Sequence, residues 1–313
     1  MSADMIEQIS EALADRVAAT SASVVAVRAG HRHLSGILWQ PDVVVTSEQL
    51  LGERAEFTVT HAGTHVVTGT PSGAPTSTTA KLAGRDAGTN VAVLKLDTPL
   101  FGTPLIDPLA DAAPTPRVGS LALVLGADAA GAPTGRLAML HAVGAEWHSM
   151  AGGRIDALLR LDVRLGADEG GPVLTPGGKL LGMSTSGPRR RALVIPAATI
   201  ARVLPALLAN GRIARGWLGV SLQPVSVPDN LRAAAGCETG MMVVSLADNA
   251  PATLAGVLQG DIVLDVDGTP ARRVRAMAAA LGPDRIGQPV ALRLLRAGEL
   301  RTLTVLITAR PAR

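Results

Sequence analysis

The sequence predicts a mostly β protein of two domains, a larger all-β domain followed by a small α+β domain. The chain has 313 residues, which exceeds the usual size of one compact domain. Its 34 glycines and 21 prolines are spread along the sequence, which favours many turns and short strands. Hydrophobic residues make up 47% and aromatic residues only 2%, so we expect cores of Val, Leu, Ile and Ala.

Residues 1–20 are predicted to form an amphipathic helix. Their apolar positions recur at helical spacing, and acidic residues stand where a signal peptide carries basic ones. No apolar run reaches the roughly 18 uncharged residues that a membrane span needs. The sequence as it stands therefore predicts a cytoplasmic protein without a membrane span. An exported, periplasmic protein is the alternative if the true start lies upstream.

Residues 21–212 are predicted to form a barrel or sandwich of antiparallel strands. Short β-rich runs, each bounded by Gly, Pro, Asp or Ser, follow one another through this region. The stretch "VIPAATIARVLPALLANGR" (194–212) then predicts a helix that ends at Asn210-Gly211. The β-rich runs are "SVVAVRAG", "LSGILWQ", "DVVVTS", "AEFTVTH", "VAVLKLD", "LALVLGA" and "ALLRLDV".

Residues 213–313 are predicted to form the second domain. The stretch that begins at Gly240 reads as a strand, a short helix, a tight turn and another strand. "VRAMAAAL" (274–281) predicts a further helix, and "QPVALRLLRAGELRTLTVLITA" (288–309) predicts a β-hairpin. We therefore expect one small α+β domain.

The net charge and the cysteine and histidine content limit the classes of ligand that the protein is expected to bind. A formal net charge of +3 with scattered arginines gives little support for nucleic-acid binding. Cys237 is the only cysteine, which excludes an internal disulfide and a cysteine-based metal site, and we expect a small apolar role for it. No histidine lies in a metal-ligand motif, and packed or solvent-facing roles are favoured over a chance metal pair on one strand face. No metal and no cofactor is predicted. The six histidines are His31, His33, His61, His65, His141 and His148.

Five motifs, in order, resemble the HtrA/DegP family of trypsin-like proteases with a C-terminal PDZ domain. They are "SGILWQPDVVVTSEQLL" (35–51), "TNVAVLKLD" (89–97), "VGSLALVLG" (118–126), "ADEGGPVLTPGGKLLGMSTS" (167–186) and "GVLQGDIVLDVDG" (256–268). The last resembles the PDZ pattern G-L-x-x-G-D-x-I-x-x-V-D-G. The resemblance implies a chymotrypsin/trypsin-like double β-barrel over residues 21–212 and a PDZ domain over residues 213–313.

The resemblance also implies that all three catalytic positions of the family are substituted. The histidine position is Gln49, the aspartate position is Asn90 and the serine position is Glu169. Peptide hydrolysis by this fold needs a hydroxyl nucleophile, an imidazole base and a carboxylate that orients it. A glutamine has no titratable nitrogen near neutral pH, and attack by a carboxylate would give a reactive anhydride. A degenerate triad, and hence a pseudoprotease, is therefore predicted. A serine endopeptidase with a misassigned site is the alternative.

The loop before the serine position also departs from the family. Ala167 stands where the family usually has glycine, and the segment that leads to Glu169 looks one residue shorter. We expect that an oxyanion hole formed at Ala167, Asp168 and Glu169 is altered, and that the Glu169 carboxylate fills it or repels an oxyanion.

Two further groups lie close to this loop in the sequence. Ser184 and Ser186 follow it on an expected strand along the substrate cleft of the family, where we expect a structural role. Arg189, Arg190 and Arg191 are expected in a solvated loop. The alternative is that they compensate Glu169 or contact an acidic partner.

Binding of peptides can outlast the loss of catalysis, because it uses strand edges and pockets. The resemblance places a carboxylate-binding loop at "GWLGV" (216–220), with the N–H groups of Trp217, Leu218 and Gly219 as donors. Val220 begins the strand along which a peptide pairs. The alternative role for Trp217 is to cover a domain interface.

The helix at 274–281 implies the other wall of this groove. Met277 and Leu281 would accept an apolar C-terminal side chain. We therefore predict a catalytically inactive protein that binds peptides or protein C-termini as scaffold, adaptor or regulator. Residues 1–20 lack the aromatic residues through which family members commonly form trimers. The sequence therefore leaves open whether the protein forms a homo-oligomer.

Overall fold

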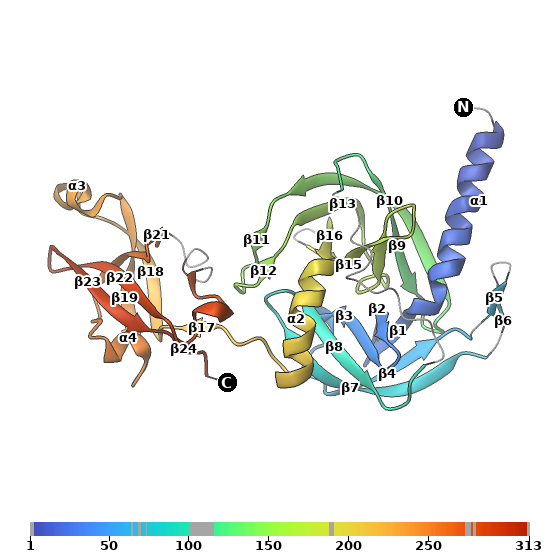
Figure 1. Ribbon diagram of the computed structural model, residues 1–313, viewed down its shortest axis with the longest axis horizontal. Coiled ribbons are helices and arrows are strands. Elements are labelled where there is room, and N and C mark those ends of the chain that lie inside the picture. Colours follow the sequence, from blue (N-terminus) through green and yellow to red (C-terminus); the bar gives the residue numbers. More distant parts are fainter. Residues whose placement is uncertain are drawn as a thin grey trace. The chain divides into compact units, whose positions relative to one another are not determined.

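The computed structural model describes residues 3–63, 65–67, 70–72, 74–100, 116–187, 191–272, 277 and 280–311. It divides into two compact units, residues 1–147 with 154–212, and residues 148–153 with 213–313 (Figure 1). The predicted fold class is confirmed, because two closed six-stranded barrels are followed by a smaller sheet domain.

The first barrel closes in the strand order β1-β2-β3-β8-β7-β4. Its interior is aliphatic, as the composition predicts, with Val25, Leu38, Val44 and Leu94 packed around Phe57. A two-residue turn joins β1 to β2, and its Gly30 has a φ of 67°. The strands are β1 (Val24–Ala29), β2 (Arg32–Gln40), β3 (Val43–Ser47), β4 (Glu56–His61), β7 (Thr76–Asp86) and β8 (Val91–Leu96).

The second barrel closes in the order β10-β13-β16-β15-β14-β9. Val124, Leu140, Leu161 and Val194 are among its buried core residues. The strands are β9 (Leu121–Ala127), β10 (Pro133–Gly144), β13 (Leu158–Arg164), β14 (Pro172–Leu174), β15 (Leu180–Ser186) and β16 (Arg191–Pro196). Two short hairpins accompany the barrels, β5 (His65–Val67) with β6 (Thr70–Ser72) and β11 (Trp147–His148) with β12 (Arg154–Ile155).

Two helices accompany the barrels. α1 (Ala3–Thr20) lies at the N-terminus, and α2 (Ala197–Asn210) follows β16. The sequence predicted the second helix from residue 194, but residues 194–196 complete β16 and the helix begins after Pro196. Gly211 ends it in the left-handed conformation, and its N–H donates to the Leu207 carbonyl. No helix in the described part of the chain is both long and apolar enough to cross a membrane.

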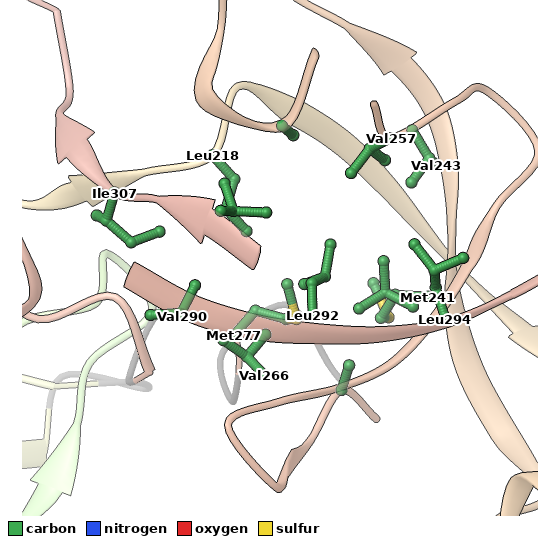
Figure 2. Close-up of a cluster of buried hydrophobic side chains, with 14 residues drawn as sticks. Leu218, Met241, Val243, Val257, Val266, Met277, Val290, Leu292, Leu294 and Ile307 are labelled. Atoms are coloured by element: carbon green, nitrogen blue, oxygen red, sulfur yellow. The ribbon is translucent and has the colours of Figure 1, made fainter. Parts of the chain in front are cut away.

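The second unit is a sheet in the order β18-β19-β20-β22-β23, so among the described strands β18 pairs on one side only. Figure 2 shows its core, in which Leu218, Met241, Met277 and Leu294 pack together. The elements are β17 (Gly216–Trp217), β18 (Val220–Ser226), α3 (Arg232–Ala235), β19 (Thr239–Leu246), α4 (Pro251–Leu254), β20 (Ile262–Val266), β21 (Thr269–Pro270), β22 (Pro289–Arg296), β23 (Glu299–Leu306) and β24 (Thr308–Ala309). Cys237 is half-buried against a small apolar cluster beside this core.

His61, the last residue of β4, is buried and is expected to make stability depend on pH. Burial lowers the pKa of the His61 imidazole below its usual 6.5, and a hydrogen bond to the Ala22 carbonyl partly opposes this. The unfolded chain therefore binds the proton first as the pH falls. The free energy of unfolding should accordingly decrease below pH ~6.5, by at most about 1.4 kcal/mol per pH unit from this group.

Urea unfolding of the native protein and of His61→Gln at pH 8 and pH 5 measures this effect. The loss of stability on acidification should be smaller in His61→Gln. The exposed His31 on the first hairpin provides the control, because His31→Gln should keep the native dependence. An equal dependence in all three proteins would contradict the role given to His61.

Candidate functional site

The three positions singled out in the sequence meet at one place. Gln49 lies in a single 3-10 turn after β3, Asn90 directly precedes β8, and Glu169 lies in the loop between β13 and β14. The Gln49 side-chain amide donates to Glu169 Oε1 at 2.5 Å. The Gln49 backbone N–H donates to Asn90 Oδ1 at 2.8 Å. Loops of both barrels thus bring these residues into one hydrogen-bonded group.

The Glu169 carboxylate is buried and is held by neutral donors. The residue is only 3% exposed. Ser47 Oγ donates to Oε1 at 3.0 Å and Ser186 Oγ donates to Oε2 at 2.6 Å, in addition to the Gln49 amide. A buried carboxylate requires such donors because desolvation otherwise penalises the charge. No lysine or arginine forms an ion pair with it within the described ranges.

Within the described residues, no arginine of the run 189–191 pairs with the Glu169 carboxylate. Arg189 and Arg190 lie outside the described residues, and Arg191 is exposed at the start of β16. Compensation of Glu169 by these arginines, the alternative to a solvated loop, therefore stays untested.

Asn90 connects the same group from the other side. Its side-chain amide donates to Thr185 Oγ1 at 2.5 Å and to Ser47 Oγ at 3.1 Å. Its φ of 56° is in the left-handed region, which asparagine tolerates better than most residues. Thr185 Oγ1 also lies 3.2 Å from the Gln49 amide nitrogen. Each polar side chain in this group thus has a partner within it.

The loop from Gly166 to Glu169 is closed by its own hydrogen bonds. The Glu169 N–H donates to the Gly166 carbonyl at 3.2 Å. The Asp168 carboxylate is 4% exposed, accepts the Gly166 N–H at 2.7 Å and pairs with Arg136 Nε at 2.8 Å. Ser35 Oγ donates to the Ala167 carbonyl at 2.8 Å. An N–H already bonded within the loop is not presented to a substrate oxygen.

The two glycines after Glu169 let this loop pack against neighbouring backbone. Gly170 has a φ of 92°, and a Cβ there would lie 2.2 Å from the Ser35 carbonyl oxygen. A Cβ at Gly171 would lie 2.0 Å from the Leu125 carbonyl oxygen. Ser184 Oγ donates to the Asp168 carbonyl at 2.7 Å, which is a structural contact. The loop is therefore fixed between β2, β9 and β15.

A second candidate site lies at the loop before β18. The Leu218 carbonyl accepts from the Ala252 N–H at 3.0 Å, and the Gly219 carbonyl accepts from the Ala247 N–H at 2.8 Å. The N–H groups of Leu218 and Gly219 have no acceptor among the described residues. Gly219 has a φ of 78°. The two carbonyl groups of this loop thus accept hydrogen bonds within the domain, and its two N–H groups remain as donors for a ligand.

The other predicted groove residues are only partly described. Met277 is 4% exposed and belongs to the core with Leu218, and Val220 and Leu281 pack against that core. Trp217 is half-buried and pairs with Thr308. The remainder of the predicted helix at 274–281 is outside the described residues, apart from Ala280. The Met277 side chain thus belongs to the buried core, and its role as a groove wall stays a prediction.

Two known domain families match the chain. The trypsin-like peptidase domain matches residues 34–183, and the PDZ domain matches residues 216–307. In the order of its domains the chain is similar to the HtrA/DegP family, with a trypsin-like domain followed by a PDZ domain. The two matches correspond to the double barrel and to the sheet of the second unit.

Individual relatives agree with this family. The probable periplasmic serine endoprotease DegP-like of Brucella suis is 28% identical over 248 residues, covering 74% of this chain and 46% of the relative. Its counterpart in Halomonas elongata is 30% identical over 252 residues, covering 73% and 48%. The chain thus spans about half the length of the curated relatives it matches.

A solved structure supports the same fold. The HtrA-type protease AlgW with decapeptide is 20% identical, with a TM-score of 0.69, and the match covers 96% of this chain and 99% of that one. At this level of identity the likeness concerns the fold.

Sequence reasoning missed several partners in the trypsin-like domain. Ser47, Thr185 and Arg136 were not singled out, although the first two contact the Glu169 group and the third holds Asp168. Ser47 follows Thr46 in the first motif and Thr185 lies between the two serines of the fourth, so both were within the quoted stretches. Arg136 had no local signal, because its partner lies 32 residues away. Within the described ranges, no three His, Cys, Asp or Glu side chains form a group that could hold a metal ion.

Proposed function

We propose that this protein is a catalytically inactive HtrA-like protein that binds peptides or unfolded protein segments, as scaffold, adaptor or regulator. The observation that carries the proposal is the group formed by Gln49, Asn90 and Glu169. Their side chains bond to one another or to shared hydroxyls, at the positions that match the triad motifs.

The chemistry of this group supports the absence of turnover. An amide at Gln49 cannot take a proton from a nucleophile, and Asn90 carries no charge to stabilise an imidazolium. The Glu169 carboxylate already accepts bonds from Gln49, Ser47 and Ser186, which reduces its nucleophilicity. Its backbone N–H donates to Gly166, so one of the two oxyanion donors of this fold is occupied.

The alternative is an HtrA-type serine endopeptidase with a non-standard site. The names of the relatives favour it, since they are probable serine endoproteases. It would need a nucleophile other than Glu169 together with a base. Among the described residues, no imidazole contacts the Glu169 carboxylate, so no histidine is in place there as a base.

Peptide capture is assigned to the PDZ domain. The free N–H groups of Leu218 and Gly219 would receive a C-terminal carboxylate, joined by that of Trp217 as the resemblance implies. The unpaired side of β18 would add the peptide as a further strand. A peptide complex of AlgW, a structural neighbour, is consistent with this use of the fold.

The cellular location is inferred from the relatives, and self-association is inferred from helix α1. The curated relatives are named as periplasmic, which favours the exported alternative over a cytoplasmic location for this chain. Met5, Ile6 and Ile9 of α1 are exposed, which supports self-association through this helix as a homo-oligomer.

Hydrolysis of unfolded casein by the purified protein tests the hypothesis that the native protein is catalytically inactive. We expect no hydrolysis above background from the native protein and none from Glu169→Ala. The triple variant Gln49→His, Asn90→Asp, Glu169→Ser should stay at least about 100-fold below an active relative, because one oxyanion donor is bonded to Gly166.

One outcome would argue against inactivity of the native protein, and a second would argue against the occupied oxyanion donor. Sustained cleavage by the native protein, abolished by changing a residue outside the Glu169 group, would favour the endopeptidase alternative. Full activity in the triple variant would show that the Gly166–Glu169 bond opens during catalysis. A serine-reactive organophosphonate provides the control, since it should label only the triple variant.

Peptide binding is a separate prediction. A decapeptide with an apolar C-terminal residue should bind the full chain, and the same peptide with an amidated C-terminus should bind at least about tenfold more weakly, because hydrogen bonds to a charged acceptor are the stronger ones. Fluorescence anisotropy measures both affinities without changing the protein. Equal affinities would exclude carboxylate capture at Leu218 and Gly219.

A further inference from the structure

A basic pocket lies on the outer face of the first barrel and shares no lining residue with the Glu169 group. It has a volume of about 570 Å³, within the range of small-molecule sites. Its walls come from β1, β2, β4 and the segment before and within β7, and the turn between β9 and β10 adds two alanines. The lining residues are Ala26, Arg28, His31, Arg32, His33, Thr58, Thr60, Pro75, Ser77, Ala129 and Ala130.

The strand register places an arginine and a histidine side by side in this pocket. Arg28 of β1 lies directly opposite His33 of β2, and Arg32 is the next residue before it. Among the described residues, no carboxylate lines the pocket. The positive charge is therefore uncompensated by the walls.

The arginines are not engaged elsewhere in the described part of the chain. Arg28 donates only to the Gly30 carbonyl, at 3.3 Å, and neither Arg28 nor Arg32 forms an ion pair there. By contrast, Arg85 and Arg136 of the same domain are each paired with a carboxylate. The one acid in the adjoining turn, Asp128, accepts from two backbone N–H groups of its own turn. The guanidinium groups of the pocket remain free to bind an anion.

Hydroxyl groups supply a second type of donor. Thr58 aligns with Arg28 across β1 and β4, and Thr60 aligns with Ala26 and with Ser77. Thr60 Oγ1 and Ser77 Oγ lie 2.9 Å apart, so one hydroxyl satisfies the other and leaves a hydrogen for a ligand. Ala26 is buried and forms part of the floor. Guanidinium, imidazole and hydroxyl donors thus surround Ala26, and such donors suit a compact oxyanion.

We propose that this pocket binds a small soluble anion that carries two or more phosphate groups. Planar guanidinium groups bind phosphate through paired N–H donors, and two arginines favour a ligand with more than one phosphate. An extended peptide is disfavoured here, because β1 is already paired with both β2 and β4 in a closed barrel and offers no free edge. The site is independent of the PDZ groove and of the Glu169 group.

Isothermal titration of the full chain with sodium tripolyphosphate at neutral pH and low ionic strength tests the proposal. We expect one site per chain. Arg28→Gln combined with Arg32→Gln should weaken binding at least about tenfold, because each removes charge-assisted bonds. The matched control combines Arg117→Gln with Arg212→Gln, which removes the same charge from exposed positions outside the pocket and should leave affinity nearly unchanged.

The outcomes separate the proposal from its competitors. No binding by the native protein, or equal weakening in both double variants, would overturn it in favour of no site or of nonspecific attraction. Tighter binding of a hexa-aspartate peptide, lost with Arg28 and Arg32, would assign the pocket to acidic peptides instead. Should the double variant misfold, tripolyphosphate must shift the NMR resonances of the His31 and His33 imidazoles more than that of His148, and an equal shift would overturn the proposal.

Discussion

Gly170→Ala is expected to destabilise the trypsin-like domain by roughly 2–5 kcal/mol. The backbone at Gly170 has a φ of 92°, which an L side chain adopts only with strain. The added Cβ would also lie 2.2 Å from the Ser35 carbonyl oxygen and 2.6 Å from Thr46 Oγ1. The backbone of β2 cannot move aside without loss of its pairing with β3.

Native-state hydrogen exchange across β2 and β3 measures this change. The control is Gly119→Ala in the same domain, where φ is 89° and no atom lies within 4 Å of the added Cβ. That variant should lose only about 1 kcal/mol, the strain of the left-handed backbone alone. Equal losses in the two variants would mean that the loop relaxes freely and is not held between the barrels as described.

Arg296→Met is expected to destabilise the PDZ domain by about 3 kcal/mol. Arg296 donates to both carboxylate oxygens of Asp261, at 2.8 and 2.7 Å. These hydrogen bonds raise the pKa of Arg296 above its usual value, although partial burial acts against this. Asp261 is 1% exposed, so removal of its partner leaves a buried charge with only the Leu258 N–H as a described donor.

Hydrogen exchange of β20 and β22 reports this loss within the intact chain. The matched control is Arg301→Met, because the Arg301–Glu299 pair has side chains that are 49% and 72% exposed. An exposed pair of this kind is worth less than about 1 kcal/mol. A larger loss from Arg301→Met than from Arg296→Met would reverse the ranking of buried over exposed pairs in this domain.

The barrel architecture was predictable from local patterns in the sequence. Runs such as those that became β3 and β8 are short, rich in β-branched residues and bounded by turn residues, and their burial on one or both faces follows directly. The start of α2 was placed three residues too early. Residues 194–196 are as apolar as a helix face requires, and only their pairing with β15 makes them part of a strand.

The candidate site was predictable in its members but not in its contacts. Motif positions indicated Gln49, Asn90 and Glu169, and the structure brings all three together. The role of Ser47 and Ser186 as donors to Glu169 depends on how two barrels meet, which no short stretch encodes. The Asp168–Arg136 pair likewise joins a residue of the loop between β13 and β14 to a residue of β10.

The free edge of β18 limits how many residues of a bound peptide can form main-chain hydrogen bonds with this strand. Pro224 lies within this strand and pairs with Met241 of β19. A proline has no N–H, and in sheets it is tolerated where that position faces away from the paired neighbour. An added strand therefore lacks a donor opposite Pro224. Under the proposed function, main-chain recognition is thus concentrated on the last few residues of a ligand, and longer peptides with the same ending should bind the PDZ domain with similar affinity.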